Sequence, residues 1–276
     1  MKKFELVLTD NKLLFGITLY RIKSLVAIEA FGVEPGDLGG YIEKESNLSH
    51  AGSAWVSGNA WVYGNALVHG NAEVYGDALV CDSAQVYGSA RVHGNAEVYG
   101  IAQVYGNAEV SGDACVYGSA QVSGSAWVFG SAQVSDNARV CGSAWVCGSS
   151  RVSGSARVYG SAWVCDDALV YGNALVFGRA WVFGNAGVYG DARVYGDARV
   201  HGQLQVLNLI GLRWSITLDS REGAGFGCRH KSMKEWTLKA AKANGLSAPL
   251  YREYKKLIVQ MRKVQNMELK GLRKKK

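Results

Sequence analysis

Histidine is the residue type in this 276-residue sequence that could act as a general base, and five histidines are present. Three of them, His69, His93 and His201, directly follow valines of a regular repeat. A base at such a position would take a proton from a hydroxyl or thiol near neutral pH. Because the valines face a core, we expect these histidines on the surface and predict no catalytic residue. His50 stands in line with the valines where the repeat begins, and we expect it to cap the core.

The six cysteines could be nucleophiles or metal ligands, but none has the C-x-x-C spacing of metal sites. Cys147 and Cys165 are 18 residues apart and should stack, and two thiols alone do not make a metal site. We predict neither metal nor cofactor. The segment MKKFELVLTDNK lacks the apolar stretch and cleavage site of a secretion signal. This predicts a cytoplasmic protein with six free thiols. No apolar run reaches the roughly 18 residues of a membrane helix, so we expect no membrane contact.

Aromatic residues recur with a spacing that predicts a binding surface. Trp127, Trp145, Trp163 and Trp181 are spaced by 18 residues. The residues two positions after them are also apolar, namely Phe129, Cys147, Cys165 and Phe183. Such a patch, of several hundred Å², is larger than a monomer usually leaves uncovered. Three covers remain open: the chain's own C-terminal helix, a second copy in a homo-oligomer such as a trimer, or a foreign protein.

A six-residue repeat must position these side chains. Valine occupies position 56 and every sixth position through Val206, which makes 26 valines. Alanine stands two residues earlier from Ala54 to Ala198, except at Ser150, and glycine usually stands two residues later. The unit A-x-V-x-G-[NSD] therefore predicts a short strand with one inward face, followed by a corner. The 18-residue spacing of the tryptophans predicts three sides per coil and about nine coils.

This repeat resembles the hexapeptide-repeat proteins, in which an aliphatic residue and a small residue four positions later face inward. The resemblance covers residues 51–206 and implies a left-handed parallel β-helix. Many such proteins are trimeric acyltransferases that bind an acyl-CoA between subunits, with a catalytic histidine and a loop that interrupts the coils. No insertion interrupts residues 51–206 here. Acyl transfer is therefore the alternative function rather than the first.

The two ends of the chain differ from the repeat. Strand-like alternation in residues 1–50 predicts a small β-rich cap that covers the open end of the β-helix. We place the β-helix at 51–218 and a basic helical region at 219–276. Residues 207–276 hold 17 Lys and Arg against 5 Asp and Glu, a net charge of +12. The net charge of the whole chain is +7, so residues 1–206 carry −5.

The basic region is expected to hold two helices. Ser232 and Glu235 form a capping box that starts the first helix. The second helix has an apolar stripe formed by Leu250, Tyr254, Leu257, Met261 and Val264. Its basic face carries Arg252, Lys255, Lys256, Arg262 and Lys263. This face is either solvated or contacts nucleic acid or a nucleotide. A glycine-rich loop, 223–227, precedes Arg229, His230 and Lys231 and could hold an anion at a helix start.

The order of the segments carries a second resemblance. The segment GDLGGYIEKESNLSH leads into the repeats, and Gly227, Cys228, His230 and Trp236 follow them. This order resembles a group of uncharacterised phage and prophage proteins and implies origin but no chemistry. We predict a non-catalytic β-helical scaffold whose aromatic patch serves self-assembly or binds a host protein, with interference in host defence as one purpose.

Overall fold

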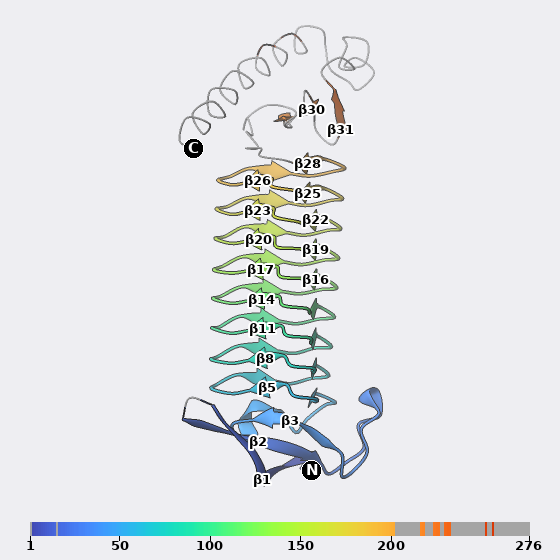
Figure 1. Cartoon of the computed structure of the whole chain (residues 1–276). Coiled ribbons are helices and arrows are strands. Elements are labelled where there is room, and N and C mark those ends of the chain that lie inside the picture. Colours follow the sequence, from blue (N-terminus) through green and yellow to red (C-terminus); the bar gives the residue numbers. More distant parts are fainter. Residues whose placement is uncertain are drawn as a thin grey trace.

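The computed structural model describes residues 2–14 and 16–201, three short strands from 216–218, 223–226 and 229–232, and Arg252 and Lys256. From residue 51 to 201 the chain winds into a β-solenoid of parallel coils, about nine in number, with three sheets along its sides (Figure 1). The predicted mainly-β, three-sided architecture is confirmed. The left hand of the coil stays a prediction, and the helical tail lies outside the described residues except for Arg252 and Lys256, whose backbone is helical.

Each sheet takes one strand from every coil. The tryptophan sheet contains β4 (Trp55–Val56), β7 (Glu73–Val74), β10 (Arg91–Val92), β13 (Glu109–Val110), β16 (Trp127–Val128), β19 (Trp145–Val146), β22 (Trp163–Val164), β25 (Trp181–Phe183) and β28 (Arg199–His201). The glutamine sheet contains β6 (Leu67–Val68), β9 (Gln85–Val86), β12 (Gln103–Val104), β15 (Gln121–Val122), β18 (Arg139–Val140), β21 (Arg157–Val158), β24 (Leu175–Val176) and β27 (Arg193–Val194).

The third sheet, the cap sheet, continues into the N-terminal segment. Its solenoid strands are β5 (Trp61–Val62), β8 (Leu79–Val80), β11 (Glu97–Val98), β14 (Cys115–Val116), β17 (Gln133–Val134), β20 (Arg151–Val152), β23 (Leu169–Val170) and β26 (Gly187–Val188). Before them come the antiparallel strands β1 (Phe4–Leu14), β2 (Ile17–Ser24) and β3 (Leu38–Ile42), and β3 pairs in parallel with β5. Two short 3-10 helices, η1 (Glu29–Phe31) and η2 (Glu45–Asn47), complete the cap.

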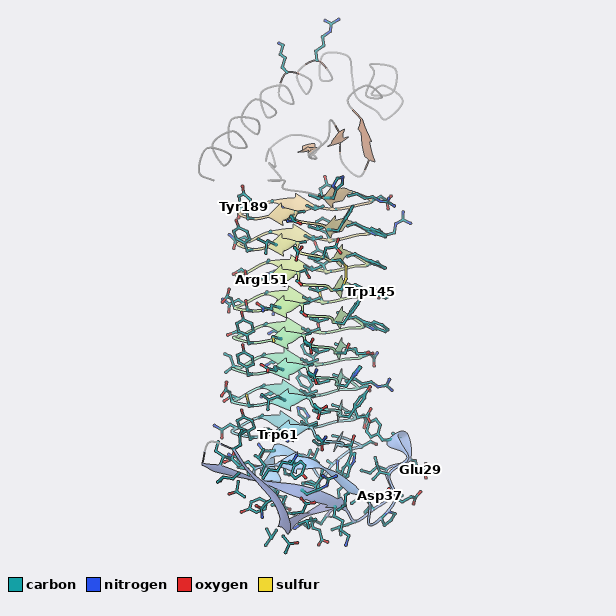
Figure 2. All side chains as sticks on the ribbon, viewed as in Figure 1. Glu29, Asp37, Trp61, Trp145, Arg151 and Tyr189 are labelled. Carbon is teal, nitrogen blue, oxygen red and sulfur yellow. A yellow bond between two sulfur atoms is a disulfide. The ribbon has the colours of Figure 1, made fainter. Side chains whose placement is uncertain are left out.

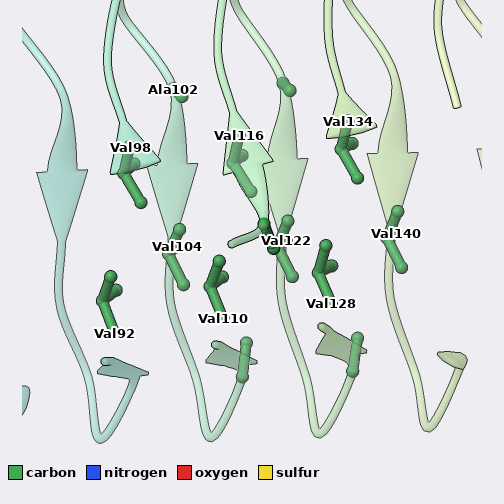
Figure 3. Packing of buried hydrophobic residues seen from close by; sticks show 14 of the residues in the cluster. Val92, Val98, Ala102, Val104, Val110, Val116, Val122, Val128, Val134 and Val140 are labelled. Atoms are coloured by element: carbon green, nitrogen blue, oxygen red, sulfur yellow. The ribbon is translucent and has the colours of Figure 1, made fainter. Parts of the chain in front are cut away.

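Alanine and valine fill the interior of the solenoid. The side chains of Val92, Val110 and Val128 lie one above another, and all are fully buried (Figure 3). Only a small and a medium side chain fit at the two inward positions of each strand, which explains why these residue types alternate. Ser150 takes the place of one alanine, and its hydroxyl donates to the carbonyl oxygen of Val164 at 3.2 Å. The buried hydroxyl is therefore satisfied.

The corners require a left-handed backbone. Gly106 has φ +75°, and a Cβ built on it would lie 3.0 Å from both the nitrogen and the oxygen of Gly124 in the next coil. Three aspartates replace glycine at corners, at φ 57° to 60°. Each uses a carboxylate oxygen to accept the N–H of the corner glycine one coil later at 2.9 Å. This hydrogen bond offsets the cost of a side chain there; the three are Asp82, Asp136 and Asp166.

The cap supplies the hydrogen-bond donors that a preceding coil would supply. Within the solenoid, backbone N–H groups donate to carbonyl oxygens of the next coil, as Gln103 donates to Ala120 at 2.9 Å. The first coil has no coil before it. Its carbonyl oxygens accept instead from the N–H of Tyr41, the side-chain amide of Asn47 and the ammonium of Lys3, and the acceptors are Ala60, Ala66 and Ala54. One donor thus reaches each of the three sheets.

His50 and Phe4 close the base of the core. The imidazole of His50 stacks on the ring of Phe4 with a centroid distance of 4.4 Å, and its Nε2 lies 2.6 Å from a carboxylate oxygen of Glu45. Its Nδ1 accepts the backbone N–H of Lys3 at 3.1 Å. His50 therefore has the capping position that its alignment with the valines predicts.

Near the C-terminus the described strands differ from the predicted loop. Gly223–Phe226 is a strand, β30, which pairs antiparallel with β31 (Arg229–Ser232) and with β29 (Ile216–Leu218). The expectation of a glycine-rich loop that begins a helix is wrong at this point, because the backbone of 223–226 satisfies its hydrogen bonds in a sheet. The β29–β30 pairing also crosses the boundary that we predicted after residue 218.

We expect Gly106→Ala to lower the free energy of unfolding by about 1–3 kcal/mol. The added Cβ meets the backbone of the next coil and forces an L side chain into a left-handed conformation. Chemical denaturation followed by circular dichroism measures the loss. The exposed neighbour Asn107 provides the control, since Asn107→Ala should stay within about 0.5 kcal/mol of the parent. Equal losses in the two variants would show that the corner tolerates a side chain.

Burial lowers the pKa of Lys3 from 10.5 to about 8. The unfolded chain therefore binds more protons than the folded chain between these values, and the destabilisation by the buried charge, complete below pH 8, fades as pH rises. We expect the free energy of unfolding to rise more steeply between pH 8 and about 9.5 in the parent than in Lys3→Met. Denaturation at several pH values compares the slopes; parallel curves would contradict the lowered pKa.

Candidate interaction surface

Four tryptophans form one continuous ladder on the tryptophan sheet. Trp127, Trp145, Trp163 and Trp181 pair in exact 18-residue register on strands β16, β19, β22 and β25. The centroid distances between successive rings are 5.1, 4.6 and 4.9 Å, and the planes differ by 6° to 8°. The strand spacing of a sheet is about 4.8 Å, so in-register indoles stack face to face without distortion. Figure 2 shows Trp145 projecting outward from the solenoid.

The ladder exposes the edges of the rings rather than their faces. Each inner ring is covered on both faces by its neighbours, and the outer face of Trp181 lies under the guanidinium of Arg199 at 5.0 Å. The end residues Trp127 and Trp181 are 40% and 37% exposed. A stacked nucleobase or sugar needs a free ring face, which this ladder does not offer along its length. A ridge of apolar edges instead suits packing against protein side chains.

Phenylalanines and a disulfide flank the ladder. The ring of Phe129 contacts Trp145 edge to face at 5.8 Å, and Phe183 contacts Trp181 in the same way at 6.4 Å. Between the phenylalanines, Cys147 and Cys165 form a disulfide with their Cα atoms 4.5 Å apart. The expectation that all six cysteines are free thiols is therefore wrong. The physical reason is the parallel register, which brings residues 18 apart within disulfide distance.

Polar groups border the patch at both ends, as the sequence predicts. On the side of Trp127, Glu109 pairs with His93 at 3.0 Å. On the side of Trp181 lie Arg199 and His201 in β28. The patch is therefore limited to four coils.

The histidines do not come together with each other or with a nucleophile. His69 stacks on Tyr87 at 4.9 Å, and His93 stacks on Tyr75 at 4.6 Å. His201 lies against Phe183 at 5.3 Å. In the part of the chain that the structure describes, no three His, Cys, Asp or Glu residues cluster in a way that could hold a metal ion. These histidines extend aromatic ladders, and none has the geometry of a general base beside a substrate pocket.

The unpaired cysteines of the solenoid are poor nucleophiles. Burial raises the pKa of the Cys81, Cys115 and Cys141 thiols, which keeps them protonated near neutral pH. Cys81 is only 7% exposed, so the expectation of an outward surface thiol is wrong there. The bulky neighbour Tyr63 shares a hydrogen bond with this thiol, and the sequence repeat alone does not reveal that contact.

Most of the predicted C-terminal contacts lie outside the described residues. Arg252 and Lys256 are exposed. Arg229, His230 and Lys231 lie in strand β31. The rest of the apolar stripe and basic face is outside the description: Leu250, Tyr254, Leu257, Met261, Val264, Lys255, Arg262 and Lys263. Among the described residues, no helix is long and apolar enough to cross a membrane.

The repeat matches a known family model in several places. The model of the YdcK β-solenoid repeat matches residues 54–70, 102–118, 132–148, 150–166 and 186–202. Each match covers 17 residues, close to one 18-residue coil, and agrees with the solenoid in the structure. No curated protein matches the chain. The chain is thus a β-solenoid repeat protein.

We expect the disulfide to be detectable by mass. Alkylation under denaturing conditions should add two fewer groups to the unreduced protein than to the reduced protein, because Cys147 and Cys165 are paired. Intact-mass spectrometry counts the groups. Cys147→Ser should abolish the difference, whereas Cys141→Ser should keep it. Equal alkylation with and without reductant would contradict the pairing.

Proposed function

We propose that this protein is a non-catalytic scaffold that self-associates through the tryptophan face. The observation that carries the proposal is the ladder of four stacked indoles with its polar borders. Apolar edges on this scale are rare on an uncovered surface. Stacking also fixes the side chains before association, so little rotamer entropy is lost when a partner binds.

A second apolar patch supports a closed ring of copies. On the cap sheet, Leu169 and Tyr171 are 43% and 42% exposed. They occupy the coil next to Trp163, so the apolar surface continues around one corner of the solenoid onto a second face. When one face of a protomer packs on a different face of the next, the assembly closes as a cyclic oligomer. Two different apolar faces therefore favour a trimer over a two-fold dimer.

The predicted origin adds a second occupant. The segment order that resembles phage and prophage proteins supports a role inside a host cell, where a host protein would compete for the same ridge. The basic residues of the C-terminal region support a contact with an acidic partner such as nucleic acid. Neither proposal depends on catalysis, and no observation on the described residues favours acyl transfer.

We expect light scattering to give about three times the chain mass for the intact protein, and about one chain mass for Trp145→Asp or Leu169→Asp. A carboxylate buried in an apolar contact has no partner and should dissociate the ring. Gln121→Asp on the glutamine sheet is the matched control and should keep the intact mass. Retention of the oligomer after truncation at Leu218 would assign assembly to the solenoid.

A monomeric intact protein at high concentration would overturn self-association. Recovery of a host protein by the intact chain, lost in Trp145→Asp and Trp163→Asp, would then make the foreign partner the occupant. A dissociated truncation with an unchanged Trp145→Asp variant would show that the tail drives assembly.

A further inference from the structure

A pocket of about 470 Å³ lies between the N-terminal hairpin and the first coils. The end of the β1–β2 hairpin projects beside the solenoid at the lower left of Figure 1. Lys12 and Leu14 of β1 form one wall. The other wall is the outer face of the cap sheet over three successive coils, where Trp61, Leu79 and Glu97 follow one another. The volume is within the range of pockets that hold small ligands or a peptide side chain.

The pocket carries more negative than positive charge. Asp77 and Glu97 line it, and Lys12 is the one cation among the lining residues. Neither carboxylate forms an ion pair among the described residues. Asp77 accepts one hydrogen bond, from the side-chain amide of Asn59 at 3.2 Å, and retains free lone pairs. An ammonium group would find two carboxylate acceptors here.

Apolar walls lead to these carboxylates. Leu14, Leu79 and Trp61 offer surface to a methylene chain. The ammonium of Lys12 already lies 4.3 Å from the centroid of Tyr41 and 5.5 Å from that of Trp61. These rings therefore suit the stem and charge of a lysine-like side chain. Burial raises the pKa of Tyr63 to about 12, so this phenol stays neutral and adds no negative charge.

One buried donor in the pocket wall lacks a partner. The indole Nε1 of Trp61 is buried without a hydrogen bond among the described residues. An unsatisfied buried donor costs about 1–3 kcal/mol, and a ligand with a carbonyl acceptor would recover part of that cost. A simple polyamine has donors but no acceptor. An extended peptide offers both a lysine ammonium and backbone carbonyls.

We propose that this pocket binds a lysine side chain on an extended peptide of a partner protein. Asp77 and Glu97 hold the ammonium, the methylene stem lies along Leu79, and a peptide carbonyl accepts from Trp61 Nε1. The incoming lysine displaces Lys12 from the Trp61 ring. The site is on the cap sheet and is independent of the tryptophan face.

The indole N–H of Trp61 gives a direct readout by NMR. We would titrate the ¹⁵N-labelled full-length protein with acetyl-Gly-Lys-Gly-amide, after assigning the Trp61 signal with Trp61→Phe. The proposal expects a saturable shift of this signal with the lysine peptide. It also expects about tenfold weaker binding of the glutamine peptide acetyl-Gly-Gln-Gly-amide, which loses the charged hydrogen bonds. Putrescine should not move the indole proton as the peptide does.

Four variants test the assignment. Asp77→Asn and Glu97→Gln should each weaken peptide binding about tenfold. Asp191→Asn is the matched control, because Asp191 also accepts from a corner asparagine, Asn173 at 3.0 Å, but lies far along the solenoid. It should leave binding unchanged. Lys12→Ala should strengthen binding, since it removes a competing cation.

Several results would overturn the proposal. They are no shift of the Trp61 signal, equal effects of putrescine and the peptide, an equal loss in Asp191→Asn, or a loss of binding in Lys12→Ala. The last result would indicate an anion site.

Discussion

The structure depends on the left-handed corner that ends each six-residue strand. Only a backbone with φ near +70° turns the chain through the corner while its N–H and C=O groups still point along the solenoid axis. Those groups then form hydrogen bonds with the next coil, as in Asn107 to Gly124 at 2.7 Å. An inserted residue would break the register of every contact between two coils. The uninterrupted repeat is the sequence expression of that constraint.

This register explains why the outward side chains form ladders. Whatever stands at one outward position lies one strand spacing from the residue 18 positions later, so chemistry repeats along a face. Stacked aromatic rings appear on all three sheets, for example Tyr87 on Tyr105 and Tyr99 on Tyr117. The ladders add packing to a solenoid whose interior holds only alanine and valine. They also make each face uniform over several coils, which suits a binding surface.

Local periodicity made the sheets, the core and the tryptophan column predictable from sequence. The valine spacing identifies the inward face, and the 18-residue recurrence of tryptophan assigns it to one side. The orientation of the rings was not predictable, because it depends on contacts between neighbouring side chains. Nor was the Cys147–Cys165 bond, since an inferred compartment took precedence over proximity in our prediction. The strand at Gly223–Phe226 was missed because glycine-rich segments usually indicate loops.

Contacts between distant segments are the part that periodicity cannot predict. Nothing in the first fourteen residues indicates that Lys3 reaches the carbonyl of Ala54 or that Lys12 lies beside Trp61. Both follow from one requirement, that the first coil needs donors and a cover. A hairpin long enough to meet that requirement also extends beyond the sheet, and the space beneath its end is the pocket. Protection of the open solenoid end thus creates a site on the cap sheet, at the opposite end of the rod from the tryptophan ladder. A partner at one site leaves the other accessible, so the same rod can bind two partners at once.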